Sequence, residues 1–230
     1  MSGTEQNLAR TGGGEAEVAP TRKLFLFDCY DTLVLERTPG STPAPAALFA
    51  QHLGVTETTA KRILYPILSA AFRPSRVQEA TTDLLGRGLR RQRLEQSLDR
   101  ARDALWWAMG NGDGRHIAAP DCAQVLRHIK KAGHEVRLIS NCVLEPEGMR
   151  RLLTGLGLSD FIDQAYYSSE GLGRKPDPDF FSRAAAGRWD TVVMVGDSEP
   201  LDMAPARSLG MRAVQVDPGR PDWDEVLRLV

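Results

Sequence analysis

The sequence predicts an α/β fold, in which a doubly wound, Rossmann-like parallel sheet carries an inserted α-helical cap. Two patterns predict it. Short apolar runs of strand length alternate with amphipathic helical patterns through most of the chain, and this alternation is typical of parallel sheets with helices on both faces. A long stretch after the first apolar run shows helical periodicity alone, which indicates a helical insert at that point.

Five segments have the length and composition of buried strands. Each is short, rich in Val, Ile, Leu or aromatic residues, and bounded by polar or turn-forming residues. The predicted strands are 23–27, 135–139, 164–167, 191–195 and 212–216. Helices are predicted between them at 122–132, 146–156, 178–186 and 200–209, with proline at several starts and glycine at several ends.

The stretch between the first two strands is predicted to form helices at 46–53, 56–72 and 91–109. Thr56 is a candidate N-cap, and Pro66 is expected to interrupt or kink the second helix. The expected organisation is a flexible tail at 1–21, an α/β core made of 22–37 and 116–230, and a helical cap at 38–115.

The composition argues against nucleic-acid and membrane partners and favours a reducing compartment. The 29 Lys and Arg residues nearly balance the 30 Asp and Glu residues, whereas nucleic-acid binding needs a net basic surface. The chain has no apolar run of about 18 residues, so no membrane span is expected. The 3 cysteines lack CxxC spacing, which favours a reducing cytoplasm over a disulfide framework or zinc site. A monomer or homodimer without nucleic-acid or membrane partners is expected.

Polar residues follow three of the predicted strands within one or two positions. Asp28 follows the first, Ser140 the second and Asp197 the fourth. Ligands of doubly wound sheets bind beyond the carboxyl ends of the strands, so these side chains are expected to meet at one site. The carboxylates of Asp28 and Asp197 offer the oxygen ligands that Mg²⁺ prefers.

Four segments give this site a family resemblance. They are FDCYDTL at 27–33, LISN at 138–141, RKPDP at 174–178 and VGDS at 195–198, with Asp202 five positions after Asp197. In this order and placement they resemble the four motifs of the haloacid dehalogenase superfamily, over about 23–217. The insert matches a helical cap of that family in position and kind only. The resemblance implies a hydrolase of small molecules.

The resemblance also implies a role for each motif. Asp28 is the expected nucleophile, because a carboxylate can form a covalent intermediate and divide one difficult step into two. Ser140 is expected to donate its hydroxyl to the transferred group, and Lys175 to place a positive charge beside it. Thr32 and Asn141 are expected to bind the substrate, and the Tyr30 carbonyl to be a metal ligand. Asp202 is expected to support the metal site or to bond Lys175, and the alternative is a carboxylate that stabilises the start of a helix.

One position departs from the phosphatase pattern. Phosphatases of the family have a second aspartate two positions after the nucleophile, acting as general acid and then base. Tyr30 stands there in this chain, and Asp31 follows where those phosphatases usually have glycine. A phenol with a pKa of about 10 is a poor base at neutral pH. Either Tyr30 is tuned, Asp31 substitutes for it, or the leaving group needs little protonation.

Tyrosine at this position is also typical of metal-independent 2-haloacid dehalogenases, which makes that activity one alternative. It is opposed by Phe181, where those enzymes usually have tyrosine, and by Asp197, for which halide release has no obvious use. A second alternative is C–P bond cleavage, with Lys61 forming a Schiff base. A third is a binding protein whose catalysis is impaired. The favoured hypothesis is a Mg²⁺-dependent phosphatase that hydrolyses a small phosphomonoester through an aspartyl-phosphate.

The helical cap is expected to set specificity by closing over the strand ends. Arg73, Arg76, Trp106 and Trp107 are the cap residues whose chemistry suits substrate contact. At least one of the tryptophans is expected in the core of the cap, and none of the four is counted as a site residue.

Overall fold

A computed structural model of the chain describes residues 21–37, 43–72, 78–94, 98–218 and 220–230. The tail predicted at 1–21 lies outside these ranges except for Thr21, and so do Arg73 and Arg76.

The sheet has five parallel strands in the order β5-β4-β1-β6-β7. Their bounds are Lys23–Phe27 (β1), Glu135–Ser140 (β4), Gln164–Tyr167 (β5), Thr191–Gly196 (β6) and Arg212–Gln215 (β7). The predicted Rossmann-like α/β core is confirmed. Because β4 and β6 flank β1 on opposite sides, the chain reverses its direction of winding beside β1, where such sheets form their ligand crevice.

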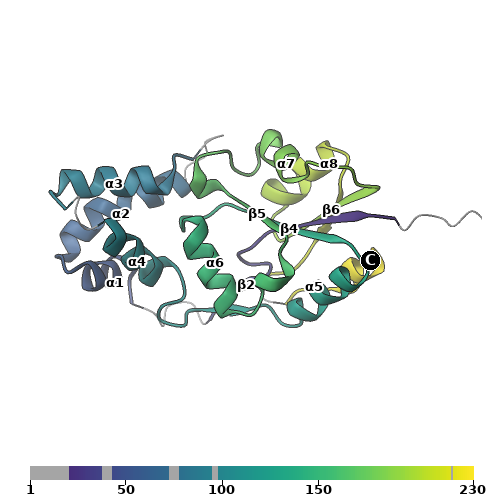
Figure 1. Ribbon diagram of the computed structural model, residues 1–230, viewed down its shortest axis with the longest axis horizontal. Helices are drawn as coiled ribbons and strands as arrows, with labels where there is room; N and C mark the ends of the chain where they lie inside the picture. Colours follow the sequence, from purple (N-terminus) through teal and green to yellow (C-terminus); the bar gives the residue numbers. More distant parts are fainter. Residues whose placement is uncertain (1–20, 38–42, 73–77, 95–97, 219) are drawn as a thin grey trace, which may run out of the picture.

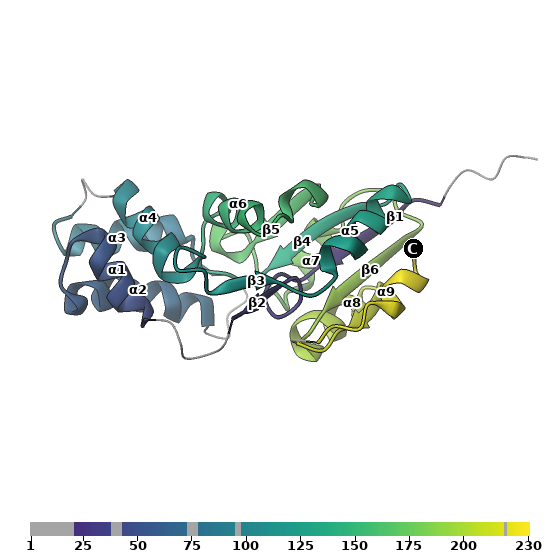
Figure 2. The same cartoon turned by 90° about the horizontal axis from the view of Figure 1, so that it is seen from below.

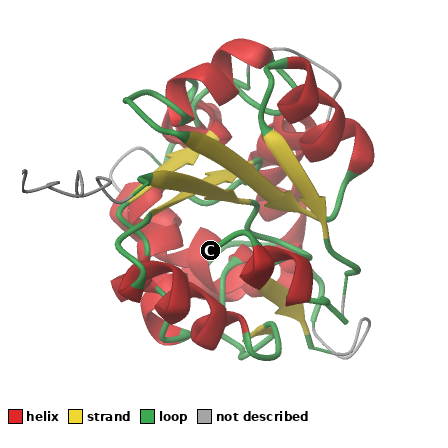
Figure 3. Cartoon of the chain, turned by 90° about the vertical axis from the view of Figure 1, so that its right-hand side faces the viewer, coloured by secondary structure: helices red, strands yellow, loops and turns green. Residues whose placement is uncertain are grey.

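Both faces of this sheet are buried, which explains the continuous apolar runs. Phe25 and Phe27 belong to the core on one face, and Leu24 and Leu26 to the core on the other. The first face is covered by α5 (Cys122–Lys131), α6 (Pro146–Gly155) and α9 (Asp224–Arg228). The second is covered by α7 (Pro178–Ala184) and α8 (Ala204–Ser208). Figure 3 shows the yellow sheet between these red layers.

Four helices gather beyond one end of the sheet and pack mainly on one another (Figure 1). They are α1 (Pro45–Leu53), α2 (Glu57–Phe72), α3 (Thr81–Arg91) and α4 (Leu98–Met109), and we refer to them together as the helical insert. The Thr56 hydroxyl accepts a hydrogen bond from the Thr59 amide at 3.2 Å, as expected of an N-cap. Helix α2 runs without interruption through Pro66. The exact division at 38–115 stays a prediction. Among the described helices, none is long and apolar enough to cross a membrane.

The helix predicted at 91–109 is wrong at its start, because α3 ends at Arg91 and α4 begins at Leu98. Helix α3 itself was not predicted, since Gly86 and Gly88 lower its intrinsic helix propensity. Gly88 is favoured by packing: an added Cβ would lie 3.1 Å from Ile63 of α2. The absence of a side chain there lets the two helices approach closely.

Two short strands, β2 (Val34–Glu36) and β3 (His116–Ala118), form an antiparallel ribbon where the chain leaves and re-enters the core. Figure 2 shows this ribbon between the helical insert and the sheet. The sequence did not predict it, because three-residue strands are too short to show a period. The helix predicted at 200–209 is a π-helical turn, η4 (Glu199–Met203), followed by α8; α9 was not predicted.

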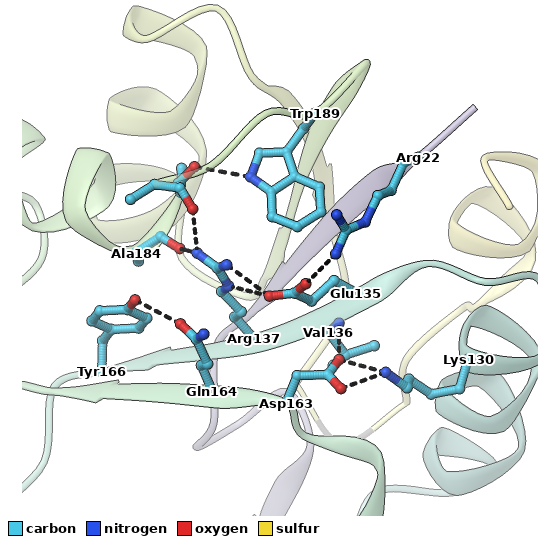
Figure 4. A network of polar contacts seen from close by, with 12 residues as sticks. Arg22, Lys130, Glu135, Val136, Arg137, Asp163, Gln164, Tyr166, Ala184 and Trp189 are labelled. Atoms are coloured by element: carbon cyan, nitrogen blue, oxygen red, sulfur yellow. Dashed lines mark hydrogen bonds and ion pairs between the residues drawn. The ribbon is translucent and has the colours of Figure 1, made fainter. Parts of the chain in front are cut away.

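A polar network joins elements at the amino end of the sheet (Figure 4). Arg137 of β4 donates to the Ala184 carbonyl at 2.8 Å, and its guanidinium lies 5.2 Å from the Trp189 ring centroid. Arg137 and Arg22 both pair with Glu135, at 2.7 and 3.1 Å. The network connects β1, β4 and α7 at the amino ends of the strands, opposite the predicted site.

Candidate active site

A cavity of about 1390 Å³ opens at the carboxyl ends of the strands, between the sheet and the helical insert. Strand-end loops, the β2–β3 ribbon and helix α2 all contribute to its wall. Its lining includes Asp28, Tyr30, Asp31, Glu36, Ala71, Phe72, Met109, Arg115, His116, Asn141, Arg174, Lys175 and Asp197. The structure therefore brings together most of the side chains that the sequence predicted to meet.

Asp28 stands at the point where β1 ends, with its amide donating to the Val195 carbonyl of β6 at 2.9 Å. Its Oδ1 atom is 2.7 Å from Lys175 Nζ and accepts a hydrogen bond from the Cys29 amide, also at 2.7 Å. Burial raises the pKa of the Asp28 carboxyl, and the Lys175 ammonium opposes part of that rise. One carboxylate oxygen is thus held in place at the cavity.

Lys175 is 2 % exposed and lies between two carboxylates. Its ammonium is 2.7 Å from Asp28 and 2.6 Å from Asp202. Burial alone lowers the pKa of Lys175, but the two carboxylates more than reverse this, so the ammonium stays charged. The Asn141 side chain fixes the backbone of this residue: its amide donates to the Lys175 carbonyl and its oxygen accepts from the Lys175 amide, each at 2.9 Å.

Asp202 is fully buried, and both of its oxygens are engaged. Oδ1 binds Lys175, and Oδ2 accepts from the Ser198 amide at 3.1 Å. Burial raises the pKa of Asp202 to about 6, although Lys175 lowers it in part. A Cβ on Gly196 would lie 2.6 Å from Oδ2, so only glycine allows this approach. These contacts favour Asp202 as the support of Lys175 over direct metal binding.

The carboxylates at the strand ends form a group that could hold a divalent cation. Oxygen atoms of Asp28, Asp197 and Asp202 lie within 4.8 Å of one another. Asp197 is half-buried, and its pKa is raised by burial and by the nearby Asp202 charge. Hard oxygen ligands of this kind suit Mg²⁺. Since Asp202 is engaged elsewhere, Asp28 and Asp197 are the side chains that could hold the ion.

Two hydroxyls of the predicted site have no hydrogen-bond partner among the described residues. Ser140 Oγ, at the end of β4, and Thr32 Oγ1 are both fully buried and unpaired. A buried hydroxyl without a partner carries a free-energy cost, which a substrate oxygen could relieve at Ser140. Neither residue belongs to the cavity lining itself.

The two residues after Cys29 differ in where their polar atoms lie. The Tyr30 hydroxyl contacts Met149 Sδ of helix α6 at 3.5 Å, and burial raises the Tyr30 pKa well above its usual range. Asp31 is exposed and lines the cavity. Its φ of 60° lies in the left-handed region, which favours glycine and tolerates aspartate better than most residues.

Several cavity residues escaped prediction. Glu36, Arg115 and His116 belong to the β2–β3 ribbon or its edge, and Arg174 precedes Lys175. The ribbon was not recognisable from periodicity, so Glu36, Arg115 and His116 carried no signal of proximity, whereas Arg174 belonged to a recognised motif but was given no role of its own. Trp106 and Trp107 are absent from the cavity lining among the described residues. Trp107 stacks on His52, and Trp106 lies under Arg151.

The family follows from comparison with known proteins. A family model described as a haloacid dehalogenase-like hydrolase matches residues 22–210. The chain therefore belongs to this family of hydrolases and is an enzyme of that class.

Individual relatives share parts of the chain. A phosphoserine phosphatase of Thermus thermophilus is 34 % identical over 48 % of this chain and 45 % of its own. A ribulose-1,5-bisphosphate 5-phosphatase of Halopiger xanaduensis is 29 % identical over 43 % of this chain and 42 % of its own. The matches thus span less than half of these relatives.

The fold also resembles solved structures. A 2-haloacid dehalogenase of Pseudomonas syringae superposes with a TM-score of 0.61 and 21 % identity, over 89 % of this chain and 90 % of its own. Such a likeness concerns the fold alone, because one fold hosts many activities.

Proposed function

We propose that the chain hydrolyses small phosphomonoesters with the help of Mg²⁺, through an aspartyl-phosphate on Asp28. The observation that carries this proposal is the buried Asp28 carboxylate at the cavity, 2.7 Å from the Lys175 ammonium and within 4.8 Å of Asp197 oxygens. A nucleophile, a fixed positive charge and a second carboxylate for a cation are what phosphoryl transfer to a carboxylate requires.

In this mechanism an oxygen of Asp28 attacks phosphorus, and the P–O bond to the leaving alcohol breaks. Lys175 and the Ser140 hydroxyl stabilise the negative charge on the phosphoryl oxygens. Asp28, Asp197 and the Tyr30 carbonyl would hold Mg²⁺, which would supply further neutralisation of that charge. Water then attacks the aspartyl-phosphate, which restores Asp28 and releases inorganic phosphate.

The proton of the leaving alcohol is assigned to Asp31 in this proposal. Asp31 lines the cavity and is exposed, whereas the Tyr30 hydroxyl is directed at Met149 and has a raised pKa. A carboxyl group can donate a proton to the leaving oxygen and then accept one from water. Asn141 acts indirectly, because it holds the backbone of Lys175. Thr32, buried in the same loop as Asp31, is proposed to bind the substrate.

The substrate is proposed to be a small phosphorylated metabolite in the cytoplasm. Two curated relatives are phosphatases whose names contain different small phosphorylated compounds, a phosphoamino acid and a sugar bisphosphate. They support the phosphate group as the common feature. We propose a monomer or homodimer acting without nucleic-acid or membrane partners.

The test is phosphate release from a panel of phosphorylated metabolites, with Mg²⁺ and with EDTA. Wild-type protein is expected to release phosphate only with Mg²⁺, and Asp28→Asn is expected to lose at least about 10³-fold in kcat. Asp179→Asn is the matched control, because Asp179 also lines the cavity but stands in the first turn of α7. Full activity of Asp28→Asn would sink the mechanism.

A second candidate is 2-haloacid dehalogenation, which Tyr30 favours. In that reaction Asp28 would attack the carbon that bears the halogen and release halide without a metal. Halide release from 2-chloropropionate that persists in EDTA, with no phosphate release from the panel, would support it. Absence of both activities would favour the non-catalytic binding protein.

A further inference from the structure

Arg174 connects the loop that carries Lys175 to the helical insert. Its guanidinium donates to the carbonyls of Ala70 and Ala71, at 3.1 and 2.8 Å, in the last turn of helix α2. It stands directly before Lys175, which binds Asp28. The contact therefore joins residues more than 100 positions apart in the sequence.

The contact answers a local need of helix α2. The last carbonyls of a helix have no partner within it, and a positive charge there interacts favourably with the helix dipole. Within its described bounds, helix α2 has no basic residue in its last turn. Arg174 supplies donors and a positive charge to this end of the helix from the core. Arg174 is only 7 % exposed, so this contact with helix α2 is made out of reach of most solvent.

The loop that carries Arg174 is held firmly on its other side. The Arg174 carbonyl accepts from the Asp177 amide at 2.9 Å, and Asn141 bonds both backbone groups of Lys175. A displacement of Arg174 would thus be passed along a short, restrained segment to Lys175. Helix α2 also contributes Ala71 and Phe72 to the cavity wall, so the same contact closes that wall beside the lysine.

We propose that Arg174 is a positioning residue, which couples the placement of helix α2 over the cavity to the placement of Lys175 against Asp28. The inference rests on the proposed phosphoryl transfer and adds a residue outside the expected catalytic set. Lys175 is then correctly placed only when the helical insert covers the site, which links water exclusion to catalysis.

The test compares Arg174→Gln with Arg151→Gln, using p-nitrophenyl phosphate and Mg²⁺. Arg151 is the matched control: it pairs with Asp103 of α4 at 2.9 Å and so also joins the core to the helical insert, but from helix α6. Arg174→Gln is expected to lower kcat by about ten- to hundred-fold, since small displacements of a positioned group have effects of this size. Arg151→Gln is expected to stay within about threefold.

A second readout separates this proposal from the proposed function. Inorganic phosphate has no leaving group, so its binding in the presence of Mg²⁺, measured by calorimetry, reports on Lys175 without turnover. Arg174→Gln is expected to weaken phosphate binding about tenfold, with Arg151→Gln unchanged. Equal kcat and equal phosphate affinity in the two variants would overturn the coupling, as would a change in KM alone. Absence of turnover in wild type would instead count against the proposed function.

Arg174→Lys completes the experiment if the glutamine variant fails to fold. A lysine keeps the charge but cannot donate to both carbonyls in the planar geometry of arginine. It is expected to fold and to keep a kcat about three- to tenfold below wild type. Wild-type kcat and phosphate affinity in Arg174→Lys would contradict a role for the two-carbonyl contact.

Discussion

Replacing Lys175 with methionine is the perturbation for which the structure allows the clearest estimate. Methionine keeps much of the volume but removes the ammonium that pairs with Asp28 and Asp202, at 2.7 and 2.6 Å. Removing one partner of a buried ion pair costs about 3–5 kcal/mol, because the remaining charge is left uncompensated. For a chain of this size that predicts a Tm about 6–20 °C lower. The measurement is urea and thermal unfolding followed by circular dichroism in EDTA.

Lys61→Met is the matched control for this prediction. Lys61 pairs with Glu57 on an exposed face of α2, with the lysine side chain 65 % exposed. Its loss should cost less than about 0.5 kcal/mol. Adding Asp202→Asn to Lys175→Met should restore about half of the lost stability, because one buried carboxylate is neutralised. If Lys175→Met lowers the free energy of unfolding by less than about 1 kcal/mol, the two carboxylates do not depend on Lys175 for compensation, and the reasoning is refuted.

Three further predictions follow from single contacts. Asp31→Asn should lower kcat by about 10²–10⁴-fold while Tyr30→Phe stays within about threefold; equal losses in steady-state assays would contradict the assignment of the proton transfer. Gly196→Ala should cost about 1–3 kcal/mol in unfolding titrations, because its Cβ would clash with Asp202; wild-type stability would show that the loop yields freely. Burial lowers the pKa of His116 in the folded protein. As the pH falls, the imidazole is therefore protonated at a higher pH in the unfolded chain than in the folded one, and the free energy of unfolding should fall as the pH drops below about 6.5. His116→Gln should flatten that dependence in titrations between pH 5 and 8, and an unchanged slope would assign it to other groups.

The sequence alone predicted a parallel sheet that is buried on both faces, and a site at the carboxyl ends of its strands. Strands buried on both faces need continuous apolar residues, so segments such as Leu24–Phe27 were recognisable without neighbours. Parallel strands bring their carboxyl ends to the same end of the sheet, and this predicts that Asp28 lies near Asp197. Local physics sufficed because both signals lie within a few residues of the chain.

Tertiary structure alone decided what each of these groups touches. The β2–β3 ribbon exists because two distant three-residue segments pair, and α3 because Gly88 lets it pack closely on α2. The Tyr30 hydroxyl meets a sulfur of α6, and Arg174 reaches carbonyls over 100 positions away. Such contacts depend on how the helices and sheet are packed, which no local period encodes. The sequence therefore determined the class of chemistry, and the packing decided which residues position it.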